Sequence, residues 1–232
     1  MTNAQEARSE FLSGAGRILP LAAGAGVYGL AFGLLAAQAG MDGLQVGIMG
    51  SAVFAGASQI VAVERFAAGA GALIAIIAGL VLNLRLLLIT ASIRDIFAGR
   101  PFWQIALGAH AATDENWALM MARRASGQKA GYWFLVGSGA SLMAVWLIAT
   151  ISGALIAAAL PEPRALGMDF AFTAAFIAIA RSLWTGRRDL LPWTVSFAVV
   201  ALSLWSGVFD KSWALILGGV SGAALAGFRR DE

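Results

Sequence analysis

Two polar side chains, Ser58 and Gln59, lie inside an apolar stretch that is long enough to enter a lipid bilayer. Hydrocarbon offers no partner to a hydroxyl or an amide, so each of them needs a protein neighbour or a substrate. On a continuous helix Ser51, Ala55 and Ser58 would share one narrow face of small side chains beside the Gln59 amide. Such a face serves close helix packing or substrate binding, and this stretch alone leaves both interpretations open.

A second polar pair, Asn83 and Arg85, lies in the apolar run from about 69 to 91. A cation at membrane depth costs about 2.5–3.5 kcal/mol on insertion scales. Arg85 must therefore extend to the interface, pair with an acidic side chain of the protein, or bind an anion such as a substrate carboxylate. All three interpretations are open at this point.

Acidic residues and the single histidine gather between residues 103 and 122, which we expect to form one helix with apolar ends and a polar middle. On that helix His110 and Asp114 are i, i+4 neighbours, and Glu115 lies about 100° round from Asp114. Desolvation raises the pKa of a carboxyl group and a nearby cation lowers it, so an acid in a cavity that alternately opens and closes can carry a proton. Asp114 and Glu115 are therefore candidates for proton coupling. Asp169 is a third candidate, and its position also fits an acidic residue at the start of a helix. The alternative for 103–122 is a re-entrant or interfacial helix whose acids face water.

The composition excludes an ordinary soluble domain. Of the 232 residues 59% are hydrophobic and only 12% are charged, about half the usual charged fraction. The net charge of +3 comes from small basic groups between apolar runs, which indicates topogenic charge rather than nucleic-acid binding. With no cysteine and one histidine, thiol chemistry and histidine-rich metal sites are excluded. We expect neither enzyme activity nor a cofactor, because a hydrolase built on His110 and Asp114 would lack an HExxH motif and a second histidine for zinc.

Apolar runs divide the chain and predict about eight transmembrane helices. The first run follows a polar segment at 1–17, has Pro20 in its first turn, and carries Gly29 and Gly33 in a spacing that permits close helix approach. Its glycines also fit an unwound segment of the kind found in transporters. We expect the tryptophans, Trp146 among them, to lie mostly near run ends in an aromatic belt. The runs cover approximately residues 18–39, 44–65, 69–91, 103–122, 131–159, 167–182, 189–207 and 212–228.

The basic residues favour both termini on the cytoplasmic side. With eight spans, eleven lysines and arginines lie on the side of the termini and four on the other side. If 103–122 does not span, seven spans remain, the ratio becomes ten to five and the N-terminus lies outside. The stretches SAVFAGASQIVA and DFAFTAAFIAIA align weakly at an offset of 118 residues, as expected for two related halves, 18–122 and 131–228, of one membrane domain over 1–232.

Five short motifs occur in order over most of the chain: Pro20 with the glycine-rich first run, FAGASQ at Phe54 to Gln59, NLR at Asn83 to Arg85, TDE at Thr113 to Glu115 and MDF at Met168 to Phe170. Together they resemble the motifs of the AzlC family of branched-chain amino acid permeases. The sequence departs from that pattern at Leu86, where family members often carry a histidine or another polar residue. The resemblance implies a bacterial inner-membrane exporter of valine, leucine, isoleucine and sometimes methionine that works with a small hydrophobic AzlD-type partner subunit. The glycines of the first run, and Gly218 and Gly222 of the last, offer faces that a partner helix can cover.

We therefore predict an all-α, polytopic transporter subunit of the bacterial inner membrane that exports branched-chain or related aliphatic amino acids, driven by protons. A zwitterionic substrate needs donors for its carboxylate, acceptors for its ammonium and an apolar pocket for its side chain. The alternative is a channel or assembly subunit that does not transport and whose polar residues only hold helices and a partner together. The predicted substrate-binding residues are Phe54 for the apolar part, Ser58, Gln59 and Asn83 for the polar end, and Arg85 for the carboxylate.

Overall fold

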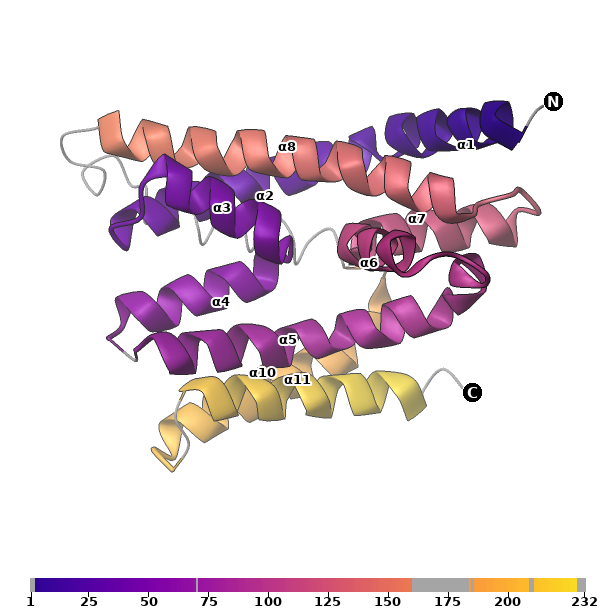
Figure 1. The fold of residues 1–232 in the computed structure, drawn as a ribbon. Coiled ribbons are helices and arrows are strands. Elements are labelled where there is room, and N and C mark those ends of the chain that lie inside the picture. Colours follow the sequence, from indigo (N-terminus) through magenta and orange to yellow (C-terminus); the bar gives the residue numbers. More distant parts are fainter. Residues whose placement is uncertain (1–2, 70, 160–183, 185, 209–210, 229–232) are drawn as a thin grey trace. The chain divides into compact units, whose positions relative to one another are not determined.

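The structure, a computed structural model, describes residues 3–69, 71–159, 184, 186–208 and 211–228 (Figure 1). These residues form ten α-helices and two short 3-10 helices, with no strand among them. The described part of the chain is thus all-α, as predicted. Two compact units divide the chain, Met1–Ala175 and Phe176–Glu232. Eight spanning helices are not found among the described residues, because only three helices there are long and apolar enough to cross a membrane.

The three long helices belong to the first unit and match three predicted runs. They are α2 (Leu19–Gln38), α5 (Ala72–Ser92) and α8 (Tyr132–Ala159). Helices α2 and α8 lie side by side and run in the same direction, with Gly33 so close to α8 that a Cβ at this position would collide with the carbonyl oxygen of Thr150. The predicted close-packing face is therefore confirmed. Because α2 is continuous, the first run contains no unwound segment.

The second predicted run is not one helix. Helix α3 (Gly43–Val53) ends at Phe54, whose backbone is left-handed at φ 36° and ψ 49°, and α4 (Gly56–Ala67) begins after the extended Ala55. A left-handed bulky residue costs of order 1–3 kcal/mol and persists only where packing holds it, and the Phe54 side chain is buried. The prediction that Ser51, Ala55 and Ser58 share one helix face is therefore wrong.

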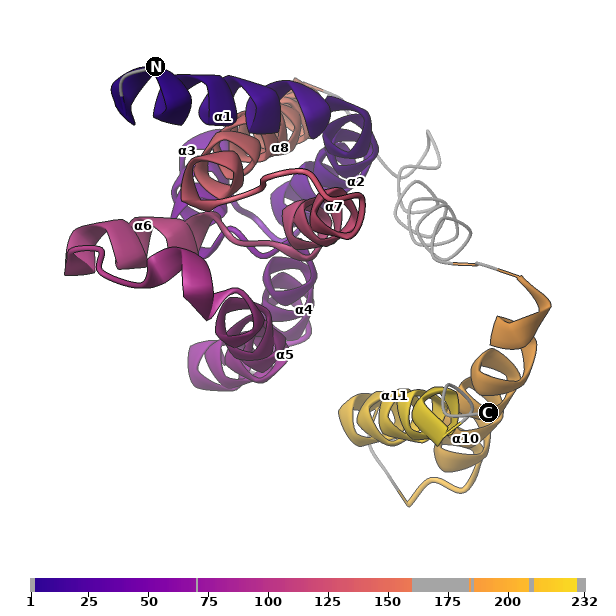
Figure 2. The ribbon, with the colours of Figure 1, turned by 90° about the vertical axis from the view of Figure 1, so that its right-hand side faces the viewer.

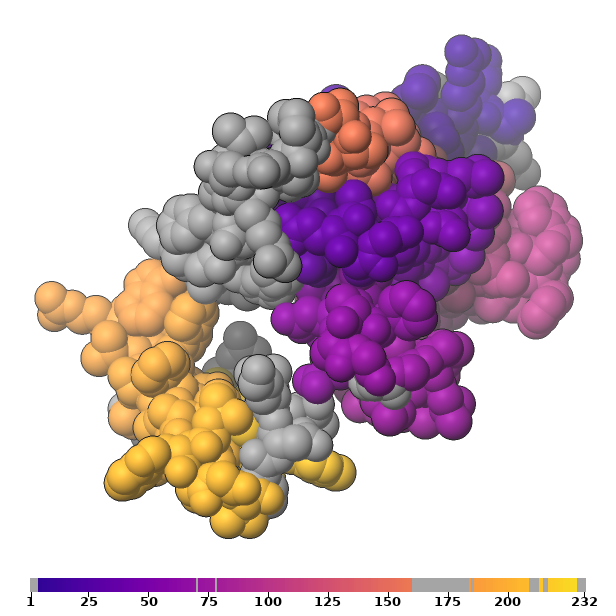
Figure 3. All heavy atoms as spheres, turned by 90° about the vertical axis from the view of Figure 1, so that its left-hand side faces the viewer, coloured from indigo at the N-terminus to yellow at the C-terminus, as the bar shows by residue number. Residues whose placement is uncertain are grey.

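Helices α3 and α4 form a hairpin that enters the unit and returns to the same end. Helix α3 runs antiparallel to α8 (Figure 1), and its glycines pack closely against that helix. In the space-filling view the atoms of this part of the chain lie directly against those of α8 (Figure 3). Helix α4 runs back beside α5 and joins it through a short turn. With 11 and 12 residues, each arm reaches only about half of a 30 Å hydrocarbon core. The α3–α8 contacts pair Gly43 with Leu155, Gly47 with Ile151 and Gly50 with Leu147.

A second hairpin enters from the opposite end. Helix α6 (Phe102–Ala111) lies across the direction of α8, and α7 (Asp114–Ala125) runs in the direction of α5 (Figure 2). Between them Thr113 caps α7 through the backbone N–H of Asn116, and the Asn116 amide donates to the carbonyl oxygen that α6 leaves free at Ala111. The prediction of one continuous helix over 103–122 is wrong, because the helix is broken between Ala111 and Asp114.

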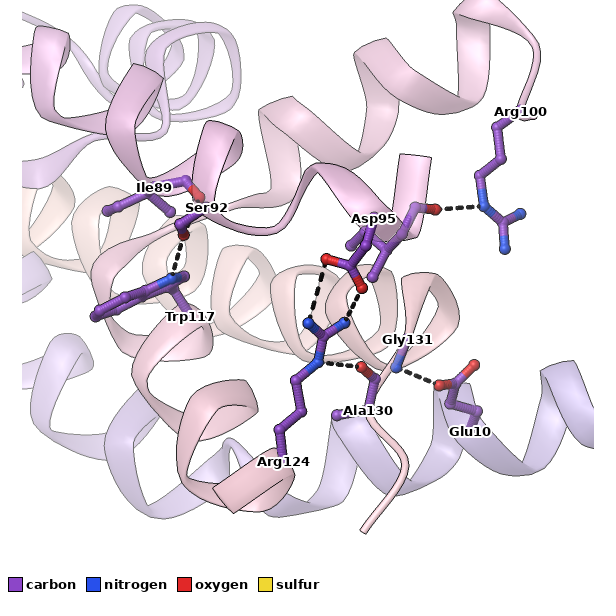
Figure 4. Close-up of polar contacts among 10 residues, drawn as sticks. Glu10, Ile89, Ser92, Asp95, Arg100, Trp117, Arg124, Ala130 and Gly131 are labelled. Atoms are coloured by element: carbon purple, nitrogen blue, oxygen red, sulfur yellow. Dashed lines mark hydrogen bonds and ion pairs between the residues drawn. The ribbon is translucent and has the colours of Figure 1, made fainter. Parts of the chain in front are cut away.

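Polar contacts fasten this second hairpin at its open end (Figure 4). The Arg124 guanidinium forms two hydrogen bonds with the carboxylate of Asp95, which lies in the 3-10 helix η1 (Arg94–Phe97) after α5. Its Nε also donates to the carbonyl oxygen of Ala130, and the adjacent Gly131 N–H donates to Glu10 of α1 (Asn3–Arg17). The N-terminal polar segment is therefore a helix that is bound to the loop before α8.

The second unit contains η3 (Arg187–Asp189), α10 (Leu190–Trp205) and α11 (Lys211–Phe228). Helices α10 and α11 correspond to the last two predicted runs. Their contact uses Gly218 and Gly222, where an added Cβ would meet backbone or side-chain atoms of Ser196. The face that we expected a partner to cover is therefore used within the chain. The predicted run 167–182, with Asp169 and the second copy of the weak repeat, lies outside the described residues.

Candidate functional site

The tips of the two hairpins meet in the middle of the first unit. His110, near the end of α6, lies with its Nε2 atom 2.9 Å from the carbonyl oxygen of Ser51 in the last turn of α3. A carbonyl only accepts, so Nε2–H is the donor. The imidazole and the Phe54 ring also lie against each other, with ring centroids 6.2 Å apart. His110 thus binds the other hairpin instead of pairing with Asp114 along one helix.

Helix α5 holds both tips with two polar residues from the middle of its length. The Ser58 hydroxyl, in the first turn of α4, donates to the Asn83 amide oxygen at 2.7 Å. Two residues further on, the Arg85 guanidinium lies 2.9 Å from the carboxylate of Asp114, the first residue of α7. About half of each side chain in this ion pair is exposed, 47% for Arg85 and 44% for Asp114. Arg85 therefore has an acidic partner within the protein.

Gln59 is completely buried beside the break in the first hairpin. Its side-chain oxygen accepts a hydrogen bond of 3.1 Å from the indole N–H of Trp146 on α8. Since an indole nitrogen only donates, the amide atom that it contacts must be the oxygen. This contact therefore fixes the orientation of the amide, and the remaining polar atom of the side chain is the amide nitrogen. That nitrogen, Nε2, has no hydrogen-bond partner among the described residues. A buried donor without a partner carries a desolvation cost of about 1–3 kcal/mol, which a ligand can offset.

Trp146 belongs to this site and not to an aromatic belt. Its side chain is buried and lies between Phe32 and Tyr28 of α2, with ring centroids 5.9 Å and 5.8 Å away. The same ring covers Gly56, where any side chain would collide with it. The prediction for Trp146 is therefore wrong, because its position in the middle of a 28-residue helix places it deep inside the unit.

The two half-helices α4 and α7 both point their amino ends towards the meeting point, but they differ in charge. The amino end of α7 is capped by Thr113 and carries Asp114 and Glu115 in its first turn. The amino end of α4 has no side-chain cap and no acidic residue. Because the amino end of a helix carries about half a positive charge, α7 is neutralised by its own acids and α4 is not.

The predicted site residues thus fall on three elements that converge. Phe54, Ser58 and Gln59 lie at the first hairpin, Asn83 and Arg85 lie on α5, and the acidic pair lies at the second hairpin. One tip offers hydrogen-bond donors and a positive helix end, and the other offers carboxylates. Among the described residues, no three histidine, cysteine or acidic side chains lie close enough together to hold a metal ion.

Two features of the site were not predicted from the sequence: the carbonyl oxygen of Ser51 that binds His110, and the helix break between α6 and α7. The Ser51 carbonyl is available only because α3 ends after it, and no proline or glycine at Phe54 and Ala55 marks that end. For the second hairpin a signal exists, since Thr113 followed by two acids and Asn116 is a helix-start pattern.

The comparisons with known proteins agree with this architecture of apolar helices. The family described as "AzlC protein" matches residues 20–160, which contain every helix of the two hairpins. The chain is 30% identical over 155 residues to a protein of Helicobacter pylori strain J99 named "Uncharacterized membrane protein", and 28% identical over 151 residues to one with the same name from strain 26695. Each alignment covers 65% of this chain and 65% of the relative, so just under two thirds of the relatives' length is matched. No solved structure matches the chain.

Proposed function

This chain belongs to the AzlC family of membrane proteins, and we propose that it is the transporting subunit of a secondary exporter of branched-chain or related aliphatic amino acids. One observation carries the proposal. Two half-helical hairpins enter from opposite ends and meet at a buried, incompletely satisfied polar centre. Secondary transporters place substrate sites near the bilayer midplane at such helix breaks, where backbone dipoles face the substrate.

The chemistry of the centre suits a zwitterion with an apolar side chain. The bare amino end of α4 and the Gln59 amide favour an anionic group. The carboxylates of Asp114 and Glu115 at the other tip favour an ammonium group. The rings of Phe54 and Trp146 supply apolar surface beside these groups.

Asp114 is our candidate for proton coupling. In the structure its negative charge pairs with Arg85 and so ties the tip of α7 to α5. Protonation removes that charge and weakens the tie, which frees the second hairpin to move. A carboxyl group that changes both its solvation and its cationic partner can load a proton on one side of the membrane and release it on the other. Glu115 then tunes Asp114, and Asp169 stays a third candidate.

The arrangement of the helices strengthens the case for a cytoplasmic N-terminus in a bacterial inner membrane. With α2, α5 and α8 as the spans, Arg65 is the one basic residue among the described residues of the first unit at the end where the first hairpin enters. Seven basic residues lie towards the other end, which is the cytoplasmic one under the positive-inside rule. They are Arg8, Arg17, Arg94, Arg100, Arg123, Arg124 and Lys129.

A small hydrophobic AzlD-type subunit remains part of the proposal on family grounds. The glycines that we expected to bind it pack within the chain, at Gly33 and at Gly218 and Gly222. These glycine faces are therefore covered by helices of the chain itself and do not indicate a partner.

Counterflow in proteoliposomes tests the proposed function. The purified chain, alone and with its small partner subunit, is reconstituted with unlabelled amino acids inside and labelled L-leucine outside. We expect saturable uptake that internal valine, leucine or isoleucine supports and internal lysine or glutamate does not. An assembly subunit gives no counterflow under either condition, and a channel gives flux that neither saturates nor depends on the internal amino acid.

A further inference from the structure

The amino end of α4 is built differently from that of α7, although both half-helices begin at the same meeting point. In α7, a threonine cap and two acidic residues occupy the positive end of the helix. In α4, the residue before the helix is Ala55, which has no side-chain acceptor, and the first backbone bond joins the N–H of Gln59 to the Ala55 carbonyl. The N–H groups of Gly56, Ala57 and Ser58 precede that bond.

A second, independent feature lies at the same place. Gln59 is fully buried, and its Nε2 has no partner among the residues that the structure describes. Helical side chains lean towards the amino end of their helix, so the Gln59 amide lies along the first turn of α4. The indole that holds its oxygen is the one that covers Gly56 in that turn. The Nε2 group of Gln59 and the first backbone N–H groups of α4 are therefore hydrogen-bond donors that lie close together at the start of this helix.

The polar residues around this region are already engaged with each other. The Ser58 hydroxyl donates to Asn83, and Arg85 pairs with Asp114. No carboxylate of the protein contacts the first turn of α4 among the bonds and ion pairs of the described residues. An anion at this point would meet donors and a helix dipole without competing for the arginine.

We propose that the first turn of α4 and the Nε2 group of Gln59 bind the carboxylate of the transported amino acid, whereas Arg85 stays with Asp114. This inference rests on the proposed function and specifies which substrate group the first hairpin recognises. Trp146 acts as a positioning residue, because its N–H fixes the Gln59 amide with the donor side free. The site then requires a carboxylate on its ligand and does not require the α-amino group.

Ligand binding to the whole purified transporter tests this assignment. The probes are L-leucine, 4-methylpentanoate and L-leucinamide. Relative to leucine, 4-methylpentanoate keeps the carboxylate and lacks the amino group, whereas leucinamide keeps the amino group and lacks the carboxylate. Leucine and 4-methylpentanoate should raise the unfolding temperature of the wild-type protein, and the rise should be smaller with 4-methylpentanoate. Leucinamide should not raise it. Stabilisation by leucinamide but not by 4-methylpentanoate would overturn the proposal without the need for any variant.

A charge variant provides the second arm. Gln59→Glu replaces the Nε2 donor by a negatively charged oxygen that would face the substrate carboxylate, and we expect leucine affinity to fall roughly ten- to a hundredfold. The matched control is Gln128→Glu, the same change in the exposed loop between α7 and α8, which should leave affinity unchanged. If leucine counterflow occurs and Gln59→Glu binds leucine as tightly as the wild type, the carboxylate assignment is wrong and the proposed function stands. If the wild-type protein neither binds nor exchanges leucine, both fail.

Discussion

Asn83 and Arg85, two residues apart on α5, each hold the first turn of a different half-helix. Asn83 accepts a hydrogen bond from Ser58 on α4, and Arg85 forms an ion pair with Asp114 on α7. One crossing helix therefore connects two hairpins that enter from opposite ends. A change in either contact is transmitted to α5, which gives the two tips a physical route for coupling.

The ion pair predicts a specific response to Arg85→Lys. Lysine keeps the charge but loses the planar guanidinium, so it binds the Asp114 carboxylate less well. Because both side chains are about half exposed, the loss should be about 1 kcal/mol or less, which corresponds to at most roughly a fivefold slower leucine exchange. Initial rates in proteoliposomes measure it, and Arg65→Lys at the end of α4 is the control. Unchanged kinetics in Arg85→Lys would favour an arginine that extends to the interface.

The contact between Ser58 and Asn83 predicts energetic coupling between α4 and α5. Ser58→Ala and Asn83→Leu should each destabilise the protein, and the double variant should be less destabilised than the sum of the two by about 1 kcal/mol. Thermal unfolding of all four proteins measures this cycle. Thr90→Val is the control, because the hydrogen bonds of the Thr90 hydroxyl in the described part of the chain stay within its own helix. Additive effects in the cycle would show that the hydrogen bond does not connect the two helices.

Asp114→Asn tests proton coupling, since asparagine keeps the shape of the side chain and removes its titration. We expect this variant to lose accumulation driven by a pH gradient and to retain leucine exchange at equal pH, slowed by roughly fivefold or less because the ion pair with Arg85 is also lost. Glu115→Gln should have a milder effect. Accumulation of leucine at the wild-type level in Asp114→Asn would place the coupled proton elsewhere, and Asp169 and Glu64 are then the next acids to replace.

The hairpins predict an unusual pattern of accessibility, which the absence of native cysteines makes simple to measure. Met41→Cys before α3 and Ala68→Cys after α4 should react with an impermeant maleimide from the same side of the membrane. Pro101→Cys and Ser126→Cys, which flank the second hairpin, should both react from the opposite side. A continuous spanning helix over 44–65 would place Met41 and Ala68 on opposite sides, and that result would contradict the hairpin.

Hydrophobic length predicted the three long helices correctly, but it did not distinguish them from the runs 44–65 and 103–122, which are as long and contain a break. The breaks were harder to find. Phe54 adopts a left-handed backbone without a glycine, held by packing against residues far away in the chain, so nothing local marks it. Between Ala111 and Asp114, Thr113 provides a local capping signal, but the apolar ends of 103–122 suggested one continuous helix.

The site residues show the same division between local and long-range causes. Gln59, Asn83, Arg85 and Asp114 were identified because polar groups in apolar runs need partners. Which partner each one takes depends on how the hairpins meet. The contact between Gln59 and Trp146 joins residues 87 positions apart, and no pattern in either segment predicts it.

The central claim is that the break in the first hairpin is a substrate site, and counterflow of L-leucine through Gln59→Leu tests it most directly. Leucine fills nearly the same volume in this apolar surrounding, so the variant should insert and fold. Gln45→Leu, which removes an exposed capping side chain at the other end of the same hairpin, is the matched control. We predict normal counterflow in the control and roughly tenfold or greater loss in Gln59→Leu, as expected for a lost hydrogen bond to a charged group. Counterflow at the wild-type rate in a correctly folded Gln59→Leu would show that Gln59 is a packing residue and that substrate binds elsewhere.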